Sequence, residues 1–234
     1  MRQLEICADS FEAARTAQRG GADRLELCGD LSLGGLTPDP GLLERVLSEL
    51  TIPVQVMIRP RGGGFIYMED ELDTMEASVR VIRRQWPGIR GFVTGALRPE
   101  GGLHREALER LQAAAGPCPL TVHRAFDQAG DPAEALALCI GLGIERVLTS
   151  GGEGTAEAGI PRLAALQRQG DGRIVILPGG GVTPQNAARI LRETGVTELH
   201  LSARKAHPLG PRPEDRCHTA DPEVIHQMRL LLDR

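Results

Sequence analysis

The sequence predicts an α/β fold, a single-domain (β/α)8 TIM barrel that spans residues 1–234. Eight short apolar segments recur about 20 to 37 residues apart, and each precedes a stretch with helical periodicity. This alternation produces a parallel sheet with right-handed crossovers, and 234 residues are enough to close eight units into a barrel. An open doubly wound sheet is the alternative, but no Gly-x-Gly-x-x-Gly follows the first strand to support it.

Four strand–helix units are predicted in the first half of the chain. The segments Leu4-Glu-Ile-Cys7 and Leu25-Glu-Leu-Cys28 alternate with period two, which is typical of strands. Ser10 is a suitable N-cap for the first helix, and Gly20-Gly21 ends that helix. The expected strands cover 4–7, 25–28, 54–58 and 91–94, and the expected helices cover 11–19, 39–50, 69–85 and 103–115.

The second half repeats this organisation. Asp131-Pro132 and Thr183-Pro184 each place a proline in a first helical turn, which marks two helix starts. The expected strands cover 120–123, 146–149, 174–177 and 198–201, and further helices are expected over 160–169 and 222–232. The proline-rich stretch 208–213 is predicted to be a surface loop before the last helix.

Composition and charge restrict the possible partners. The net charge of -4 and the lack of a basic patch with interleaved aromatic residues argue against nucleic acid. No apolar run approaches the roughly 18 residues of a membrane span, and no signal peptide is evident, so we expect a cytoplasmic protein. Five scattered cysteines without a Cys-x-x-Cys motif are expected to be free thiols there. An acidic barrel of this size is expected to form a homo-oligomer, a dimer or a tetramer.

Polar residues alternate with aliphatic ones along several strands and are expected to face the barrel interior. The helix-facing side of a barrel strand is apolar, so the polar positions point inward. Buried charges are costly, and their position at the carboxyl ends of the strands indicates a binding or catalytic site. A network that only fixes the shape of the barrel is the competing interpretation. The expected middle level holds Glu5, Glu26 and His200, and the upper level holds Cys7, Cys28, Arg59, Thr94, His123, Thr149 and Ser202.

Cys7 and Cys28 end adjacent predicted strands at matching positions. Neighbouring strands lie about 4.8 Å apart, so the two thiols can approach each other closely. Paired soft thiolates suit Cu(I), and His123 and His200 are candidate further ligands. The alternative is that both cysteines only fill space, because free cysteine is among the most buried residue types.

An enzymatic function is the second possibility. Barrel enzymes of the isomerase, epimerase or lyase type combine carboxylates and histidines as acids and bases. Here Glu26 and His123 are the candidate acid and base, with Arg59 holding an anionic substrate beside them. Hydrogen-bonded core histidines are the alternative interpretation. A Schiff-base aldolase is unfavoured because Lys205, the only lysine, lies beyond the end of the last strand.

Glycine-rich turns and arginines indicate an anion site for a small anionic or phosphorylated molecule. Phosphate sites in barrels commonly use the loops after strands seven and eight, where backbone N–H groups and a helix N-terminus meet the anion. The alternative is that these glycines only form tight turns. The candidate anion-binding residues are Arg61, Gly179, Gly180, Gly181, Ser202 and Arg204.

These motifs resemble those of the CutC copper-homeostasis protein family. The resemblance implies a cytoplasmic (β/α)8 barrel, often oligomeric and linked to copper tolerance, with Cu(I) as the bound metal. The two cysteines proposed as Cu(I) ligands in the family fall on Cys7 and Cys28. The matching stretches, in chain order, are 4–7, 21–28, 34–38, 58–63, 123–127, 146–151, 178–181 and 202–204.

Two departures from the family pattern bear on function. The arginine–glycine loop commonly ends Gly-Gly-Asp-Phe in the family, whereas here it is Gly63-Gly64-Phe65, which removes a carboxylate from the barrel mouth. The C-terminal region is also shorter than in many members, which affects the surface available for oligomer contacts.

Overall fold

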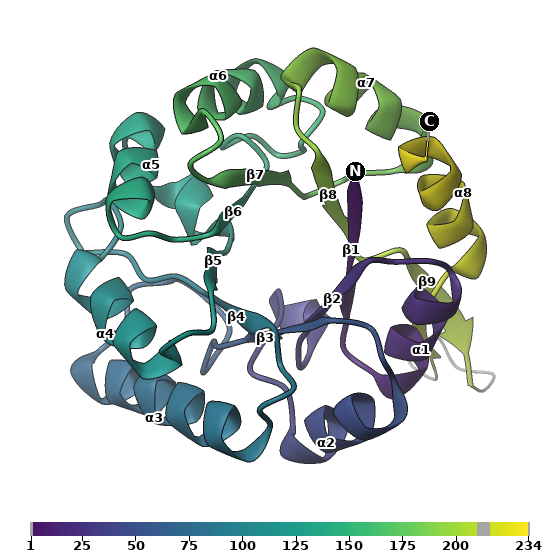
Figure 1. Cartoon of the computed structure of the whole chain (residues 1–234), viewed down its shortest axis with the longest axis horizontal. Coiled ribbons are helices and arrows are strands. Elements are labelled where there is room, and N and C mark those ends of the chain that lie inside the picture. The colour runs from purple at the N-terminus through teal and green to yellow at the C-terminus, as the bar shows by residue number, and fades with distance from the viewer. Residues whose placement is uncertain (1, 210–215, 234) are drawn as a thin grey trace.

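The computed structural model describes residues 2–209 and 216–233 and confirms the predicted barrel. Its eight parallel strands lie in the order β7-β6-β5-β4-β3-β2-β1-β8. The two end strands of this order, β7 and β8, lie next to each other and complete the circle (Figure 1). The strands are β1 (Gln3–Ala8), β2 (Arg24–Leu27), β3 (Val54–Met57), β4 (Gly91–Thr94), β5 (Leu120–Val122), β6 (Arg146–Thr149), β7 (Val175–Pro178) and β8 (Glu198–Leu201).

Eight α-helices of the described chain surround the strands (Figure 1). Asp39, Asp131 and Asp221 cap three of them through hydrogen bonds to backbone N–H groups, and a proline follows each aspartate in the first turn. The helices are α1 (Phe11–Arg19), α2 (Pro40–Glu49), α3 (Glu69–Gln85), α4 (Arg105–Ala115), α5 (Pro132–Gly141), α6 (Ile160–Gly170), α7 (Pro184–Thr194) and α8 (Pro222–Leu232). Two short 3-10 helices, η1 (Leu31–Leu33) and η2 (Arg124–Gln128), follow β2 and β5.

The main hydrophobic core lies between the strands and the helices. Leu4, Ile6, Leu25 and Leu27 are fully buried there, as their alternation with polar residues predicts. Burying one such side chain stabilises the fold by about 1.5–3 kcal/mol, so this layer holds the barrel together and leaves the interior positions for polar groups.

The barrel interior is staggered, which changes the predicted levels. Glu5 is in register with Arg24 on one side and with His200 on the other, while Cys7 is in register with Glu26. The predicted register of Glu5 with Glu26 and of Cys7 with Cys28 was therefore wrong by two residues, whereas the register of Glu5 with His200 is confirmed. Strands of a closed barrel tilt, so equivalent positions of neighbouring strands are offset along the axis.

Two threonines expected in the interior lie on its outer side. On β4, Val93 faces the thiols while Phe92 joins the main core, so Thr94 shares the side of Phe92. On β6, Arg146 and Leu148 face inward, which places Thr149 outward. Both hydroxyls are satisfied without the interior, since Thr94 donates to the Ile58 carbonyl and Thr149 to the Asp127 carboxylate. A hydroxyl that finds a local acceptor does not need to point into the barrel.

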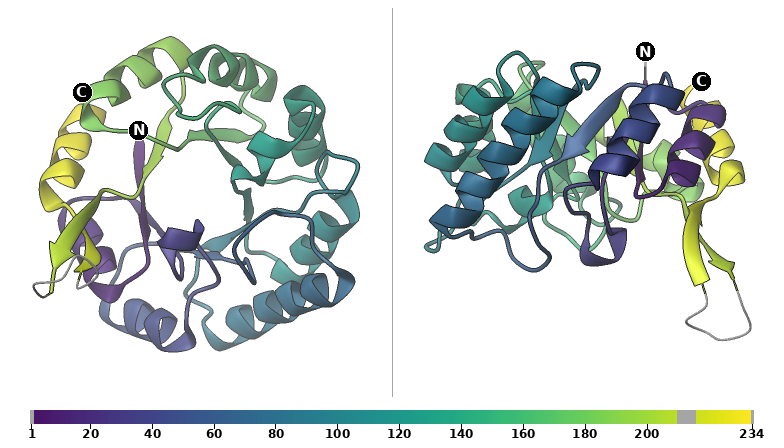
Figure 2. Two further views of the ribbon diagram at one scale, coloured as in Figure 1. Left: turned by 180° about the vertical axis from the view of Figure 1, so that it is seen from behind. Right: turned by 90° about the horizontal axis from the view of Figure 1, so that it is seen from below.

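A two-stranded hairpin precedes the last helix, where the sequence predicted only a loop. Its antiparallel strands are β9 (Arg204–Pro208) and β10 (Arg216–Ala220). Figure 2 shows it projecting from the barrel on the side away from the N-terminus. Residues 210–213 of the predicted loop lie outside the described residues. In the described part of the chain, no helix is both long and apolar enough to cross a membrane.

Candidate metal centre in the barrel mouth

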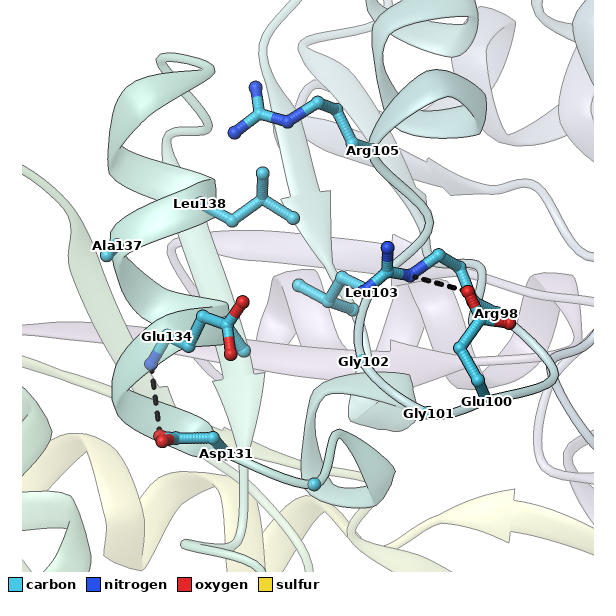
Figure 3. A pocket seen from close by; sticks show the side chains of 12 residues that line it. Arg98, Glu100, Gly101, Gly102, Leu103, Arg105, Asp131, Glu134, Ala137 and Leu138 are labelled. Atoms are coloured by element: carbon cyan, nitrogen blue, oxygen red, sulfur yellow. Dashed lines mark hydrogen bonds and ion pairs between the residues drawn. The ribbon is translucent and has the colours of Figure 1, made fainter.

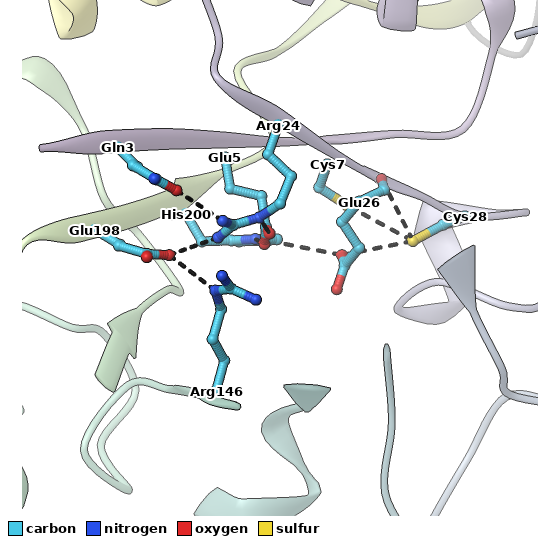
Figure 4. A network of polar contacts seen from close by, with 9 residues as sticks. All are labelled: Gln3, Glu5, Cys7, Arg24, Glu26, Cys28, Arg146, Glu198 and His200. Atoms are coloured by element: carbon cyan, nitrogen blue, oxygen red, sulfur yellow. Dashed lines mark hydrogen bonds and ion pairs between the residues drawn. The ribbon is translucent and has the colours of Figure 1, made fainter. Parts of the chain in front are cut away.

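The first two strands and β8 bring soft and hard donor atoms together in one buried cluster (Figure 4). The Cys7 and Cys28 sulfurs are 3.9 Å apart, and the Cys28 sulfur lies 3.5 Å from a Glu26 carboxylate oxygen. The Nε2 atom of His200 is 3.8 Å from the same carboxylate. One donor atom each of Cys7, Glu26 and His200 lies within 4.8 Å of the other two. We name Cys7, Cys28, Glu26 and His200 the thiol cluster.

An ion-pair network lies beneath the thiol cluster and holds it in place (Figure 4). Arg24 donates to Glu5 at 2.5 Å, to Glu198 at 2.6 Å and to the amide oxygen of Gln3 at 2.9 Å. Arg146 donates to Glu198 at 3.1 Å. Because Glu5 also bonds to Nδ1 of His200 at 2.7 Å, the network fixes the orientation of that imidazole ring. Arg24, Arg146 and Glu198 were not predicted as site residues, although their alternation with aliphatic residues marks them as inward-facing.

The electrostatic environment sets the resting protonation states of the cluster. Burial alone would raise the pKa of Glu5, but the hydrogen bond from His200 and the charge of Arg24 lower it to about 2. Burial alone would lower the pKa of His200, but the Glu26 and Glu5 carboxylates and the contact with Cys7 raise it well above its usual value. His200 is therefore an imidazolium at neutral pH.

Both thiols are protonated at rest. The hydrogen bond with Cys28 and burial raise the pKa of Cys7 well above its usual value. That bond acts in the opposite direction on Cys28, but burial and the Glu26 carboxylate raise the pKa of Cys28 to about 12. Metal ligation requires thiolates, so a metal that binds here must displace protons.

A loop over residues 29–36, the cover loop, closes the thiol cluster from the outside. Gly35 has a left-handed φ of +84°, and a Cβ atom at this position would lie 3.1 Å from the Cys28 sulfur. Arg59 fixes the loop, since its Nη1 donates to the carbonyls of Leu33 at 2.8 Å and of Gly35 at 3.1 Å. Cys28 is 0% exposed as a result.

Replacing Arg59 by alanine is expected to increase the alkylation rate of Cys28 at least tenfold. Hydrogen bonds from a charged donor contribute about 1.5–3 kcal/mol each, and a loss of 1.4 kcal/mol makes loop opening about tenfold more frequent. Residue-resolved mass spectrometry after iodoacetamide pulses at pH 8 measures this rate. Arg61→Ala is the control, because Arg61 bonds to Glu71 and to its own loop instead. Equal Cys28 rates in the wild type and Arg59→Ala would contradict this role of Arg59.

The structure places His123 with a different set of partners. Its ring packs at a tilt of 46° against the ring of Phe65, with ring centroids 4.7 Å apart. The guanidinium of Arg59 lies 4.9 Å from the centroid of the same Phe65 ring. Burial and the charge of Arg59 lower the pKa of His123 to about 3, so it is neutral. The contacts of His123 among the described residues do not include the thiol cluster. Glu26 is thus paired with His200 and not with His123.

The predicted anion-binding residues divide into two places. Arg61 lies on the far side of its loop, in a bidentate pair with Glu71 at 2.5 and 3.1 Å. The glycine turn after β7 and the segment after β8 instead share a cavity of about 510 Å³, which Gly180, Gly181, Ser202 and Arg204 line. Gly179 lies deeper, where a Cβ atom would meet Leu148 at 2.5 Å and His200 at 3.2 Å. Arg124 also lines this cavity and was not predicted.

A second hollow, of about 570 Å³, lies between the loop after β4 and helix α5 (Figure 3). Its charged groups are exposed and neutralise one another, as in the pair between Arg98 and Glu100 at 3.6 Å. Asp131 accepts from the backbone of Glu134 and so serves as a helix cap. These side chains do not converge on a common point, so we place no site there.

Comparison with known proteins gives a consistent result. The family model described as "CutC family" matches residues 2–205. The human "Copper homeostasis protein cutC homolog" is 48% identical over 207 residues, which is 88% of this chain and 75% of the human protein. The crystal structure of the putative copper homeostasis protein CutC from Streptococcus agalactiae superposes with a TM-score of 0.80 at 34% identity, over 86% of this chain and 99% of that one. A phosphoribosyl anthranilate isomerase from Thermococcus kodakaraensis, at 15% identity and a TM-score of 0.60 over 99% of both chains, shares the fold alone.

Proposed function

Because the chain belongs to the CutC family, we propose that it serves copper homeostasis by binding Cu(I) at the thiol cluster. Cys7 and Cys28 would supply two thiolates, and His200, which has a donor atom within 4.8 Å of the Cys7 sulfur, is a candidate third ligand. We further propose that the protein works in the cytoplasm, where reduced thiols and Cu(I) are both maintained.

The observation that carries this proposal is the separation of 3.9 Å between the two sulfurs. Both sulfurs can reach one ion of low coordination number without a change in the strands. Cu(I) accepts such a soft, low-coordinate donor set, whereas Mg²⁺ and Ca²⁺ prefer an oxygen shell that the apolar neighbours Met57, Val93 and Leu31 do not provide. His123, with its separate contacts, is not needed for this site.

Replacing either Cys7 or Cys28 by serine is expected to weaken Cu(I) binding at least tenfold, because a hydroxyl is a poor ligand for a soft ion. An anaerobic competition with a chromogenic Cu(I) chelator measures the affinity. Cys139→Ser is the matched control, since Cys139 is also a fully buried free thiol but lies in helix α5. Unchanged affinity in the Cys7 and Cys28 variants would rule out the thiol cluster as the copper site.

Catalysis on a small anionic or phosphorylated molecule is the second candidate function, of the isomerase, epimerase or lyase type. The observation that favours it is the position of His200, which pairs with Glu5 and Glu26 and also lines the cavity beside β8. An imidazolium between two carboxylates can give up or take back a proton at a bound substrate. The acid–base pair would then be Glu26 with His200. The original pair of Glu26 with His123, assisted by Arg59, has less support because Arg59 is committed to backbone carbonyls.

A further inference from the structure

One wall of the cavity between the ends of β7 and β8 is the backbone that follows β7, from Gly180 to Thr183. Gly180 and Gly181 follow β7 with left-handed φ values of +92° and +70°. The chain then enters α7, which has Thr183 as its N-cap and eleven residues. Successive glycines in this conformation, followed by a helix N-terminus, form a concave surface with partial positive charge.

Two guanidinium groups line the same cavity. Arg124 is held by Asp127 at 2.8 Å and by the Ser150 hydroxyl at 3.0 Å. This leaves its Nη1 toward Gly180, where a Cβ atom would be only 3.3 Å away. The Nε of Arg204 is buried and has no hydrogen-bond partner among the described residues, and an unpaired buried donor is unfavourable.

The remaining lining residues leave the positive charge in excess. Lys205 and Asp221 face each other at 3.4 Å, and Asp221 is the one carboxylate among the lining residues that the structure describes. The buried residue His200 is also part of this wall. Asp127, the carboxylate that pairs with Arg124, lies outside the lining, so the arginines of the lining, Arg124 and Arg204, face no second carboxylate within the described cavity wall.

We propose that this cavity binds the phosphate group of a small molecule, with Arg124, Arg204 and the N–H groups of Gly181 and Val182 as its ligands. A volume of about 510 Å³ accommodates a metabolite larger than phosphate itself. This phosphate site is separate from the proposed Cu(I) site. It would also bind the substrate of the second candidate function. Its test measures phosphate binding alone, so the result does not depend on whether the protein catalyses a reaction.

Titration of the apo protein with inorganic phosphate at constant ionic strength tests this proposal by calorimetry. The wild type is expected to bind phosphate with a millimolar or lower Kd, and Arg124→Gln and Arg204→Gln are each expected to weaken binding at least tenfold. Arg204→Lys, which keeps the charge, is expected to lose less. Arg98→Gln is the matched control, because Arg98 lines the other hollow (Figure 3).

Circular dichroism melting curves show whether each variant is folded. The affinity for Cu(I) is a second control, and neither Arg124→Gln nor Arg204→Gln should change it more than twofold. Two results would overturn the proposal. One is a wild type that binds phosphate no better than chloride, and the other is an equal loss of binding in Arg98→Gln.

Discussion

Replacing Arg24 by alanine is expected to lower the free energy of unfolding by about 3–5 kcal/mol at pH 7. Arg24 is 5% exposed and is the shared partner of two buried carboxylates, those of Glu5 and Glu198. Without the guanidinium, Glu5 keeps only His200 and Glu198 keeps only Arg146, so two buried carboxylates lose most of their compensating charge. Denaturation by urea, followed by circular dichroism, measures the change.

The control for this prediction is Arg105→Ala. Arg105 pairs with Glu109 at 3.4 Å on the surface of α4, with both side chains about half exposed. Such a pair contributes only about 0–1 kcal/mol. A loss below about 1 kcal/mol in Arg24→Ala would show that the network beneath the thiol cluster does not stabilise the barrel.

The affinity for Cu(I) is expected to rise about a hundredfold for each pH unit, or about 10⁴-fold between pH 6 and pH 8. The pKa of Cys28 is raised to about 12 and that of Cys7 is also raised, so both thiols are protonated throughout this range. Two protons must therefore leave for each Cu(I) that binds, and affinity increases as the proton concentration falls. The slope does not level off until the pH approaches these raised pKa values.

The same chelator competition, repeated at several pH values and corrected for protonation of the chelator, measures this slope. If His200 also ligates the metal, it must lose its proton too, and the affinity then rises about a thousandfold for each pH unit. In His200→Gln this rise should return to about a hundredfold for each pH unit. An affinity that does not change with pH would exclude a thiolate site.

Much of the fold could be predicted because each strand–helix unit carries its own local signals. The aliphatic positions of β1 and β2 and the Asp-Pro pair at the start of α5 depend only on neighbouring residues. The hairpin of β9 and β10 was missed, because Arg204–Pro208 does not alternate in polarity and is mostly exposed.

The geometry of the site was less accessible, because it depends on how distant strands are offset. The pairing of Cys7 with Glu26 follows from the tilt of the closed barrel, which no local pattern reveals. Arg59 was predicted as a substrate ligand from its position after β3, but its partners, the carbonyls of Leu33 and Gly35, lie on another loop. Arg124 directly follows His123 in the sequence, and only the fold shows that it faces the glycines after β7.

For a metal bound as we propose, the closed cover loop would make the rate of exchange independent of the affinity. Cys28 is 0% exposed beneath Gly35, so an ion could bind or leave the Cys28 sulfur only while the loop is open. Above a certain concentration of the molecule that delivers the metal, the rate of metal binding would equal the rate at which the cover loop opens, and it would no longer increase. Release would be limited in the same way, and handover to another protein would be fast only if that partner displaced the loop from Arg59.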